Sequence, residues 1–439
     1  MATESQIKPR SGLKKWLPFP ELTSLKLRDY RLWWLSSSTV MLNQFTTQMV
    51  LAWWVKTELG DPILVGTIVL AFGIPSAILL FPAGLVADKW DRKKQLMASQ
   101  AVALISAIGL ALFISFDIAT FSIGVAFALI SGSTVAFSGP ARQALIPMLV
   151  PRRLLMNGVV LGSLSMNTSR LIAPSIAGLL MAAIGVNAAL FFIAALLLVG
   201  IIALASMRIP HFAEDDAPPE SVQGSGQGGR ASAAAQKPGI LATLGGGILF
   251  LWGHKPLLVL MVLYMATGLF ITGPLLVIVP LLVADVWELS SGALGLAFGV
   301  QAATGMITGF YLTRLGGLRN KGGFFALAMM GGGSSFALYS VAPVFVLGLV
   351  FFMTYGVAAS LYSSMSQTLI QSHTPREVMG RVLSLNQLSI QGLGPIGAFM
   401  AGAMAQFMGP QTTGLIGGLI GLSMATTALL FARKFRQMS

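Results

Sequence analysis

The chain consists of long runs of apolar residues that are separated by short polar segments. Most runs are at least as long as the roughly 20 residues with which a helix crosses a bilayer. The pattern predicts twelve membrane-spanning helices, at residues 31–57, 64–88, 95–116, 120–147, 157–182, 187–207, 257–284, 291–314, 323–341, 344–370, 378–404 and 410–432. The sequence therefore predicts an all-α membrane protein.

A single polar stretch interrupts this pattern in the middle of the chain, between Pro210 and Pro238. It is rich in Pro, Gly, Ser, Ala and acidic residues, a composition that cannot bury an apolar core. We therefore expect five parts: an N-terminal cytoplasmic segment (1–30), a six-helix bundle (31–207), a cytoplasmic linker with a short interfacial helix (208–255), a second six-helix bundle (256–432) and a cytoplasmic tail (433–439).

The two predicted bundles repeat each other in sequence. The run Leu70 to Gly73 recurs as Leu296 to Gly299, Gly84 recurs as Gly309, and Gln143 recurs as Gln367. Six spans return the chain to its starting side, so the repeats are parallel and related by an axis along the membrane normal. This arrangement is typical of transporters whose two halves rock against each other.

The composition agrees with a membrane location, because 55% of the residues are hydrophobic and 10% are charged, against roughly 25% in soluble domains. The net charge of +13 does not indicate nucleic-acid binding, because the basic residues are spread over short loops. All of them except Lys56 and Arg170 fall on one side, which predicts an inner or plasma membrane protein with both termini in the cytoplasm. The absence of cysteine excludes disulfides and thiolate metal sites.

The loop from Gly84 to Lys94 resembles the cytoplasmic signature of the major facilitator superfamily. The segments Tyr30 to Trp33, Gly60 to Gly66 and Ser169 to Pro174 are similar to the branch that contains enterobactin-type siderophore exporters and macrolide efflux proteins. The resemblance implies the major facilitator fold, with twelve transmembrane helices in two parallel six-helix repeats, and transport by alternating access.

A cytoplasmic gate is implied by the same resemblance. Asp88 stands where the family's acid is thought to pair with basic residues and with the start of the eleventh span, which here begins with a Thr374 cap and Glu377 in a capping-box pattern. The alternative is a solvated charge cluster that only sets the topology. The residues assigned to this gate are Gly84, Asp88, Arg92, Arg142, Thr374 and Arg376.

Arg170 lies near the middle of the fifth predicted span, where an unpaired charge is costly. No acidic residue lies deep in any predicted span, so its counter-charge is expected to be backbone carbonyls, water or an anionic group of a substrate. Arg170 is thus either a cavity residue that binds substrate or helps gating, or a brace for helix ends.

Polar residues cluster on the first, fifth, tenth and eleventh spans, whereas the sixth has none inside it. This distribution predicts which helices line a substrate cavity, although plain packing is the alternative for each aromatic residue. The candidate cavity residues are Asn43, Gln44, Thr47, Gln48, Asn167, Arg170, Tyr264, Gln301, Tyr355, Tyr362, Asn386 and Gln387.

The fifth and eleventh predicted spans each carry a Pro beside small residues. Pro174 and Gly178 belong to a segment that resembles the fifth-span motif of antiporters, with Ala173 and Ala177 where that motif prefers Gly, and Gly394 and Pro395 form a similar element in the eleventh span. A Pro bends a helix and small residues allow close approach, so these residues are expected to form a hinge, an outer seal or tight packing.

The energy source is left open by the sequence. His211, His254 and His373 fall in predicted loops, and Asn43-Gln44 stands where relatives often carry Gly-Asp, which weakens the case for simple proton antiport. Protons remain one candidate coupling ion, through acids at the span ends, and exchange or downhill transport is the alternative.

No phosphate-binding, nucleophile-elbow or zinc-protease motif is present, so we expect no enzyme activity, cofactor or metal. We therefore predict a monomeric secondary transporter in the lipid bilayer that exports an amphipathic small molecule. The molecule would be drug-like or siderophore-like, and an anionic group on it would bind Arg170. The alternatives are an importer or lipid translocator of the same fold, and a membrane receptor or scaffold that does not transport.

Overall fold

The computed structural model describes residues 22–79, 82, 83, 86, 90–209, 249–314, 320–388, 392–436 and 438, and all regular structure in these ranges is helical. The N-terminal half (residues 22–209) contains η1 (Ser24–Lys26), α1 (Arg28–Leu59), α2 (Pro62–Ile78), α4 (Arg92–Ser115), α5 (Phe121–Leu149), η2 (Arg152–Leu154) and α6 (Leu155–Ser206). The C-terminal half (residues 249–438) contains α8 (Lys255–Thr267), η5 (Gly268–Thr272), α9 (Gly273–Leu281), η6 (Leu282–Val286), α10 (Ser291–Arg314), α11 (Lys321–Ser340), α12 (Phe345–His373), α13 (Arg376–Leu388), α14 (Gly394–Phe431) and α15 (Arg433–Arg436). The elements η5 and η6 are π-helical.

Local sequence explains where several of these helices begin and end. Gly60 ends α1 in the left-handed region, and Pro62 opens α2 at a position where its missing N–H costs no helical hydrogen bond. The Asp91 side chain caps α4 by accepting a hydrogen bond from the Lys94 N–H at 2.8 Å. Thr120 caps α5 in the same way.

Helices α6 and α14 each contain a sharp turn. Gly185 in α6 has φ 80° and ψ 168°, and Gly409 in α14 has φ 80° and ψ 160°. Only glycine adopts such angles without strain. The turns fall between the predicted spans 157–182 and 187–207, and between 378–404 and 410–432, so each long element holds two consecutive predicted spans.

Seven helices of the described chain are long and apolar enough to cross a membrane, and two of these are α6 and α14 with their internal turns. The prediction of an all-α membrane protein is confirmed. The count of twelve stays a prediction, because parts of the second and eleventh spans lie outside the described residues. Most of the predicted linker and N-terminal segment also lies outside them, so the division into five parts stays a prediction.

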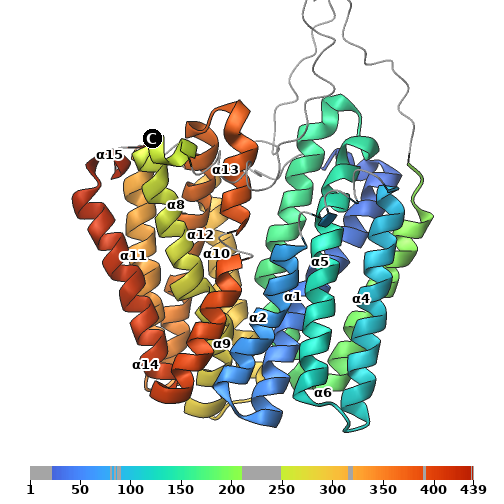
Figure 1. Cartoon of the computed structure of the whole chain (residues 1–439), viewed down its shortest axis with the longest axis horizontal. Helices are drawn as coiled ribbons and strands as arrows, with labels where there is room; N and C mark the ends of the chain where they lie inside the picture. Colours follow the sequence, from blue (N-terminus) through green and yellow to red (C-terminus); the bar gives the residue numbers. More distant parts are fainter. Residues whose placement is uncertain are drawn as a thin grey trace, which may run out of the picture.

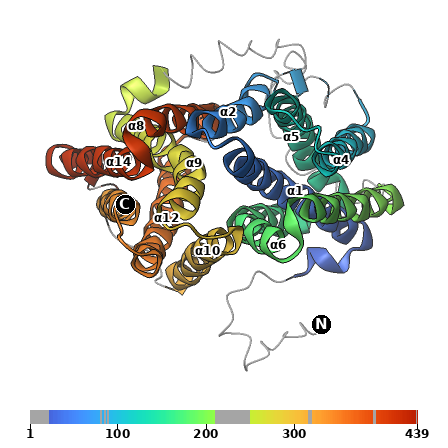
Figure 2. The ribbon, with the colours of Figure 1, turned by 90° about the horizontal axis from the view of Figure 1, so that it is seen from below.

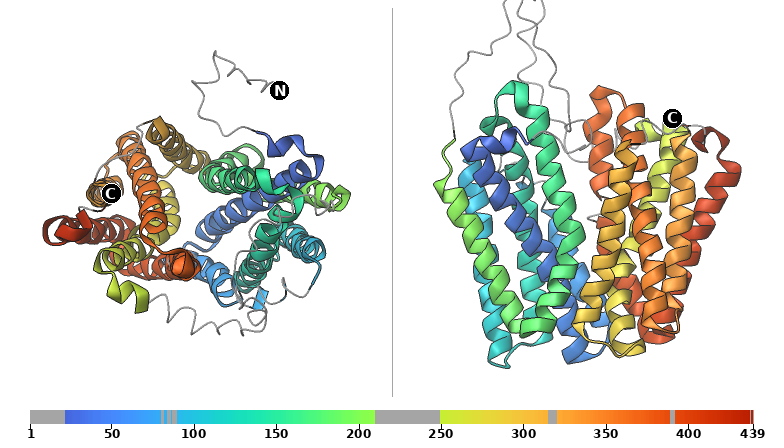
Figure 3. Two further views of the ribbon diagram at one scale, coloured as in Figure 1. Left: turned by 90° about the horizontal axis from the view of Figure 1, so that it is seen from above. Right: turned by 180° about the vertical axis from the view of Figure 1, so that it is seen from behind.

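The two halves form two helical bundles that lie side by side (Figures 1 and 3). In the N-terminal half, α1 packs on α6, and α5 packs on α2 and α4. In the C-terminal half, α11 packs on α12 and α14, and α10 packs on α12. Two helix pairs form most of the contact between the halves, α2 with α14 and α6 with α10 (Figure 2).

The halves meet at one end of the molecule, which we call the Lys56 end because Lys56, Gly60 and Asp285 lie there. In Figure 1 this is the lower end, and the bundles diverge toward the end that carries α13 and α15. At the Lys56 end the joining helices approach closely: a Cβ atom on Gly66 would lie 2.8 Å from the Ala398 carbonyl oxygen, and one on Gly295 would lie 2.7 Å from the Leu179 nitrogen. These two seams, α2/α14 and α6/α10, therefore depend on small residues.

Candidate functional site

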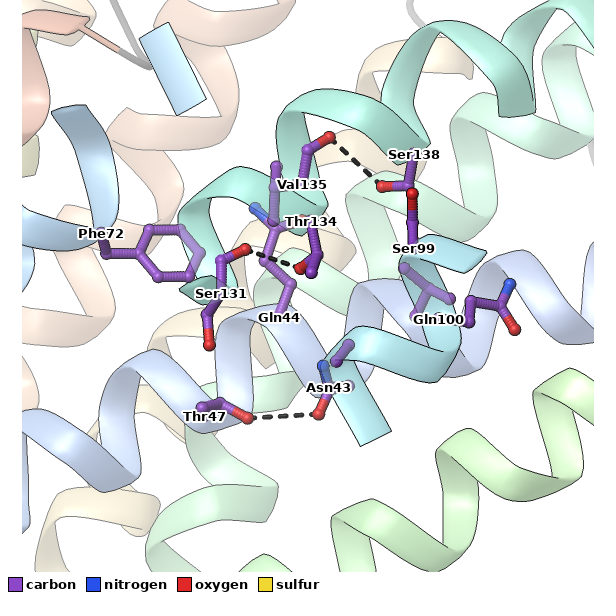
Figure 4. A pocket seen from close by; sticks show the side chains of 12 residues that line it. Asn43, Gln44, Thr47, Phe72, Ser99, Gln100, Ser131, Thr134, Val135 and Ser138 are labelled. Carbon is purple, nitrogen blue, oxygen red and sulfur yellow. Dashed lines mark hydrogen bonds between the residues drawn. The ribbon is translucent and has the colours of Figure 1, made fainter. Parts of the chain in front are cut away.

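A small polar pocket lies inside the N-terminal half, between α1, α2, α4 and α5 (Figure 4). Its volume is about 20 Å³, which is room for about one water molecule. Its lining contains no charged residue and consists of Val40, Asn43, Gln44, Thr47, Phe72, Ser99, Gln100, Ala103, Ser131, Thr134, Val135 and Ser138.

Hydrogen bonds hold part of this lining in place and leave part of it free. Thr134 donates to the Ser131 carbonyl on its own helix at 2.7 Å, and the Thr47 hydroxyl donates to the Asn43 Oδ1 at 3.2 Å (Figure 4). Gln100 is buried and donates from Nε2 to the Ser36 hydroxyl at 2.8 Å. The pocket can therefore offer amide and hydroxyl groups to a small neutral hydrogen-bonding group or to water.

A second group of polar residues includes members of both halves. Arg170, on the first part of α6, is within electrostatic range of Tyr264 of α8 and Tyr355 of α12. The Tyr264 side chain lies near that of Ser363. The Tyr355 side chain lies near those of Tyr362 and of Thr272 of η5. We call Arg170, Tyr264, Tyr355 and Tyr362 the Arg–Tyr cluster.

The part of α6 that carries Arg170 is fixed to α1. Tyr30 donates from its hydroxyl to the Gly158 carbonyl at 2.7 Å, and Trp34 donates from Nε1 to the Leu161 carbonyl at 3.1 Å. The Ser38 and Ser165 hydroxyls lie 2.6 Å apart and share a hydrogen bond. Arg170 has no acidic partner within ion-pair distance among the described residues, so its charge is available to an anionic group.

The tyrosines of the cluster belong to a larger aromatic arrangement in the C-terminal half. Tyr355 stacks on Phe352, with ring centroids 5.6 Å apart, and Phe352 stacks on Tyr339 at 4.6 Å. Tyr264 meets Tyr362 edge to face at 6.4 Å. Such contacts hold the rings in defined orientations and present both ring faces and hydroxyls.

The structure divides the predicted cavity residues among separate places. Asn43, Gln44 and Thr47 lie in the polar pocket, whereas Arg170, Tyr264, Tyr355 and Tyr362 lie in the Arg–Tyr cluster. Neither Gln48, which is half-buried on α1, nor Asn167, which is exposed on α6, lines the pocket. The backbone carbonyl of Gln301 lies close to Gly356 of α12. Asn386 of α13 is half-buried, and the Gln387 side chain lies outside the described residues.

The predicted cytoplasmic gate is described only in part. Gly84, Asp88 and the side chain of Arg376 lie outside the described residues. Arg92 donates from Nη1 to the Met148 sulfur at 3.1 Å and to the Ala144 carbonyl at 3.4 Å, so it binds α5 of its own half. The Arg142 Nη1 and the Thr374 hydroxyl are buried and have no hydrogen-bond partner among the described residues. The gate stays a prediction.

The predicted bend and seal residues lie at or beside the two seams. A Cβ atom on Gly178 would overlap the backbone of Gly295, and one on Gly73 would overlap Pro395. Pro174 is buried within α6, one residue before Ser175, which faces Gly299 of α10. Gly394 opens α14 and its carbonyl approaches Gly273 of α9 in its own half.

Some polar residues of these sites were not expected from the sequence. Ser99, Gln100, Ser131, Thr134 and Ser138 line the pocket. The spacing of Ser131, Thr134 and Ser138, three and then four residues apart, would place them on one helix face and was the available signal. Among the described residues no group of His, Asp or Glu could hold a metal ion.

Comparison with known proteins shows which family has this organisation. The family model described as Major Facilitator Superfamily matches residues 33–398. The enterobactin exporter EntS of Shigella boydii serotype 4 (strain Sb227) is 27% identical over 387 residues, which cover 85% of each chain. EntS of Escherichia coli O139:H28 (strain E24377A / ETEC) is 26% identical over 371 residues, which cover 82% of this chain and 81% of the relative.

Solved structures agree on the fold. An auto-inhibited peptide transporter of the POT family aligns with a TM-score of 0.69 and 12% identity, over 93% of this chain and 97% of that chain. This likeness concerns the fold alone, and it confirms the predicted major facilitator architecture. Because the family model covers most of the sequence and the helices form the same fold, the chain belongs to the major facilitator superfamily.

Proposed function

We propose that this chain, a multi-pass membrane transporter by its family and not an enzyme, exports an amphipathic, anionic small molecule by alternating access. The observation that carries the proposal is the Arg–Tyr cluster. A cation from one half is within electrostatic range of tyrosines from the other half, so a substrate that binds between them would contact both halves. A ligand with contacts to both halves can favour one closed arrangement over another.

The chemistry of the cluster supports an aromatic or amphipathic anion as substrate. Arg170 provides a charge with no acidic partner among the described residues, and the tyrosines provide hydroxyl donors and ring faces. The polar pocket of the N-terminal half adds uncharged amide and hydroxyl groups for a further polar part of the substrate. The relatives named enterobactin exporter support the same direction of transport and a siderophore-like substrate.

The arrangement of the halves supports loading from the cytoplasm. The seams close the Lys56 end, and the distribution of basic residues assigns the opposite end to the cytoplasm of an inner or plasma membrane. In this orientation the described arrangement is the one that accepts a substrate for export, and opening of the Lys56 end releases it outside. We expect a monomer to carry out this cycle, with protons as one candidate coupling ion.

The test is accumulation of a catechol siderophore, a panel of dyes and a panel of antibiotics in cells that produce the chain. We expect lower accumulation of at least one anionic compound, and a loss of transport of tenfold or more in Arg170→Ala. Arg153→Ala, which removes an exposed basic residue of η2, is the matched control and should transport normally. Folded protein in both variants is measured by size-exclusion chromatography of a fluorescent fusion.

Other results would change the proposal in defined ways. Higher accumulation in producing cells would indicate an importer. Unchanged accumulation of every compound would favour lipid translocation or a receptor role. Export that continues in the presence of a protonophore would exclude the proton gradient as its energy source.

A further inference from the structure

The two halves are joined at the Lys56 end by an ion pair. The Lys56 Nζ lies 2.6 Å from the Asp285 Oδ1, and this is the single ion pair among the described residues. Lys56 belongs to α1 in the N-terminal half and Asp285 to η6 in the C-terminal half. The pair is therefore a charged contact across an interface whose seams are formed by small residues.

Both partners are held by rigid backbone. Lys56 lies in the last turn of α1, where its carbonyl accepts the Gly60 N–H and its Nζ approaches the Gly60 carbonyl at 3.4 Å. Asp285 lies in a π-helical turn that the Trp287 N–H closes on the Leu282 carbonyl at 3.0 Å. Trp287 also donates from Nε1 to the Ala342 carbonyl at 3.2 Å, which ties this turn to the end of α11. π-Helical turns often mark functional positions.

We propose that the Lys56–Asp285 pair is a latch that holds the Lys56 end closed and sets how often this end opens. This inference depends on the proposed function in one respect, namely that the Lys56 end opens during the transport cycle. The seams supply packing in the closed arrangement, and the ion pair adds an attraction that is lost when the halves separate.

The two side chains of the pair differ in solvent exposure. Substitution of one partner should therefore weaken the latch more than substitution of the other. The Lys56 side chain is 10% exposed, whereas that of Asp285 is 39% exposed. Removing Asp285 leaves a nearly buried ammonium without a counter-charge, which disfavours the closed arrangement. Removing Lys56 leaves a carboxylate that water already reaches, so its effect should be smaller.

The experiment measures opening of the Lys56 end with a single cysteine. The chain has no native cysteine, so a reporter can be introduced without background. Ser175→Cys is suitable because Ser175 is buried in the α6/α10 seam, with its hydroxyl 3.5 Å from where a Cβ of Gly299 would stand. The rate of labelling by a membrane-impermeant maleimide then reports how often the seam opens to that side.

We expect Asp285→Asn to raise the labelling rate about fivefold, near the upper end for partly exposed ion pairs. Lys56→Gln should raise it about twofold. Glu58→Gln is the matched control, because it removes a negative charge from the same helix end, two residues from Lys56, and should leave the rate unchanged. Labelling is measured in right-side-out and in inverted vesicles, which tests the latch separately from the orientation of the chain in the membrane. If the chain has the reverse orientation, the differences in labelling rate among the variants appear in inverted vesicles instead.

Equal labelling rates for Asp285→Asn and the unsubstituted reporter would overturn the latch, whether or not transport is observed. If Asp285→Asn fails to fold, the exchanged pair Lys56→Asp with Asp285→Lys serves instead and should label close to the unsubstituted rate. High salt should also raise the labelling rate of the unsubstituted reporter, because it screens a partly exposed pair. A rate that is independent of salt would count against the latch.

Discussion

Helices α5 and α12 occupy equivalent places in the two halves. An offset of 224 residues maps Phe121 and Leu149, the ends of α5, onto Phe345 and His373, the ends of α12. The same offset maps Gly132 onto Gly356. A Cβ atom on Gly132 would overlap the Phe72 carbonyl of α2, and one on Gly356 would overlap the Gln301 carbonyl of α10. In both halves, therefore, this glycine of the fourth helix packs against a backbone carbonyl of the second helix.

The residues beside these glycines differ in kind. Ser131 and Ser138, which line the polar pocket, map onto Tyr355 and Tyr362 of the Arg–Tyr cluster. The first helices differ as well: α1 is a regular α-helix, whereas the equivalent segment Lys255–Val286, also 32 residues long, contains the π-helical turns η5 and η6.

The repeat therefore preserves the packing of the bundle and not the chemistry of its lining. The N-terminal half presents small uncharged hydrogen-bonding groups, and the C-terminal half presents aromatic rings and phenol hydroxyls. Arg170 of the first half is within electrostatic range of tyrosines of the second half. A substrate that uses both halves would therefore carry polar and aromatic parts, and the following variants test this division.

The largest effect is expected where the halves are alike. Gly132→Val and Gly356→Val each insert a side chain against a backbone carbonyl that cannot move aside, and overpacking of this kind typically costs about 1–3 kcal/mol or more. We expect both to lower the melting temperature and the yield of folded protein. Gly139→Ala on α5 is the control, because nothing lies within 4 Å of its Cβ position. Normal stability in only one of the two valine variants would show that the framework is not shared.

A loss of transport without a loss of folding is expected from Arg170→Lys. Lys keeps the charge but lacks the planar guanidinium that can contact an anion and tyrosine hydroxyls together. We expect transport efficiency to fall about tenfold while the yield and melting temperature stay close to those of the unchanged chain. An equal loss of folded protein would indicate that Arg170 braces the helices.

We expect Tyr355→Phe to weaken substrate affinity about threefold. It removes the hydroxyl that lies near Tyr362 and Thr272 while it retains the stacked ring. Tyr339→Phe is the matched control from the same aromatic stack, because the Tyr339 hydroxyl is buried and has no partner among the described residues. Removing it should be neutral or stabilising. Equal effects of the two variants on affinity would show that Tyr355 contributes through packing alone.

Much of the fold could be predicted from the sequence because the bilayer imposes long apolar runs on the helices that cross it. The turns at Gly185 and Gly409 fall in the short gaps between predicted spans for this reason. Arg170 was also recognisable, because a charge inside an apolar run is costly and so marks a special position.

The partners of these residues could not be predicted in the same way. Single Ser and Thr residues inside an apolar span often bond their own helix, as Thr134 does, so they give a weak signal for a pocket. Lys56 was expected away from the cytoplasmic side, but nothing in the local sequence of Lys56 or Asp285 shows that they form a pair. Such contacts arise only when the two halves are assembled.

The smallest effect is expected from giving the N-terminal half a residue of the C-terminal half. The equal lengths of α1 and Lys255–Val286 map Gln44, which lines the polar pocket, onto the buried Ile271. We expect Gln44→Ile to weaken substrate affinity about twofold, because one amide is lost from the pocket, and to leave the melting temperature unchanged or slightly higher. Thr134→Val is the control, since that hydroxyl bonds its own helix. If affinity is unchanged in Gln44→Ile, the pocket holds only water and packing, and substrate recognition belongs to the Arg–Tyr cluster alone.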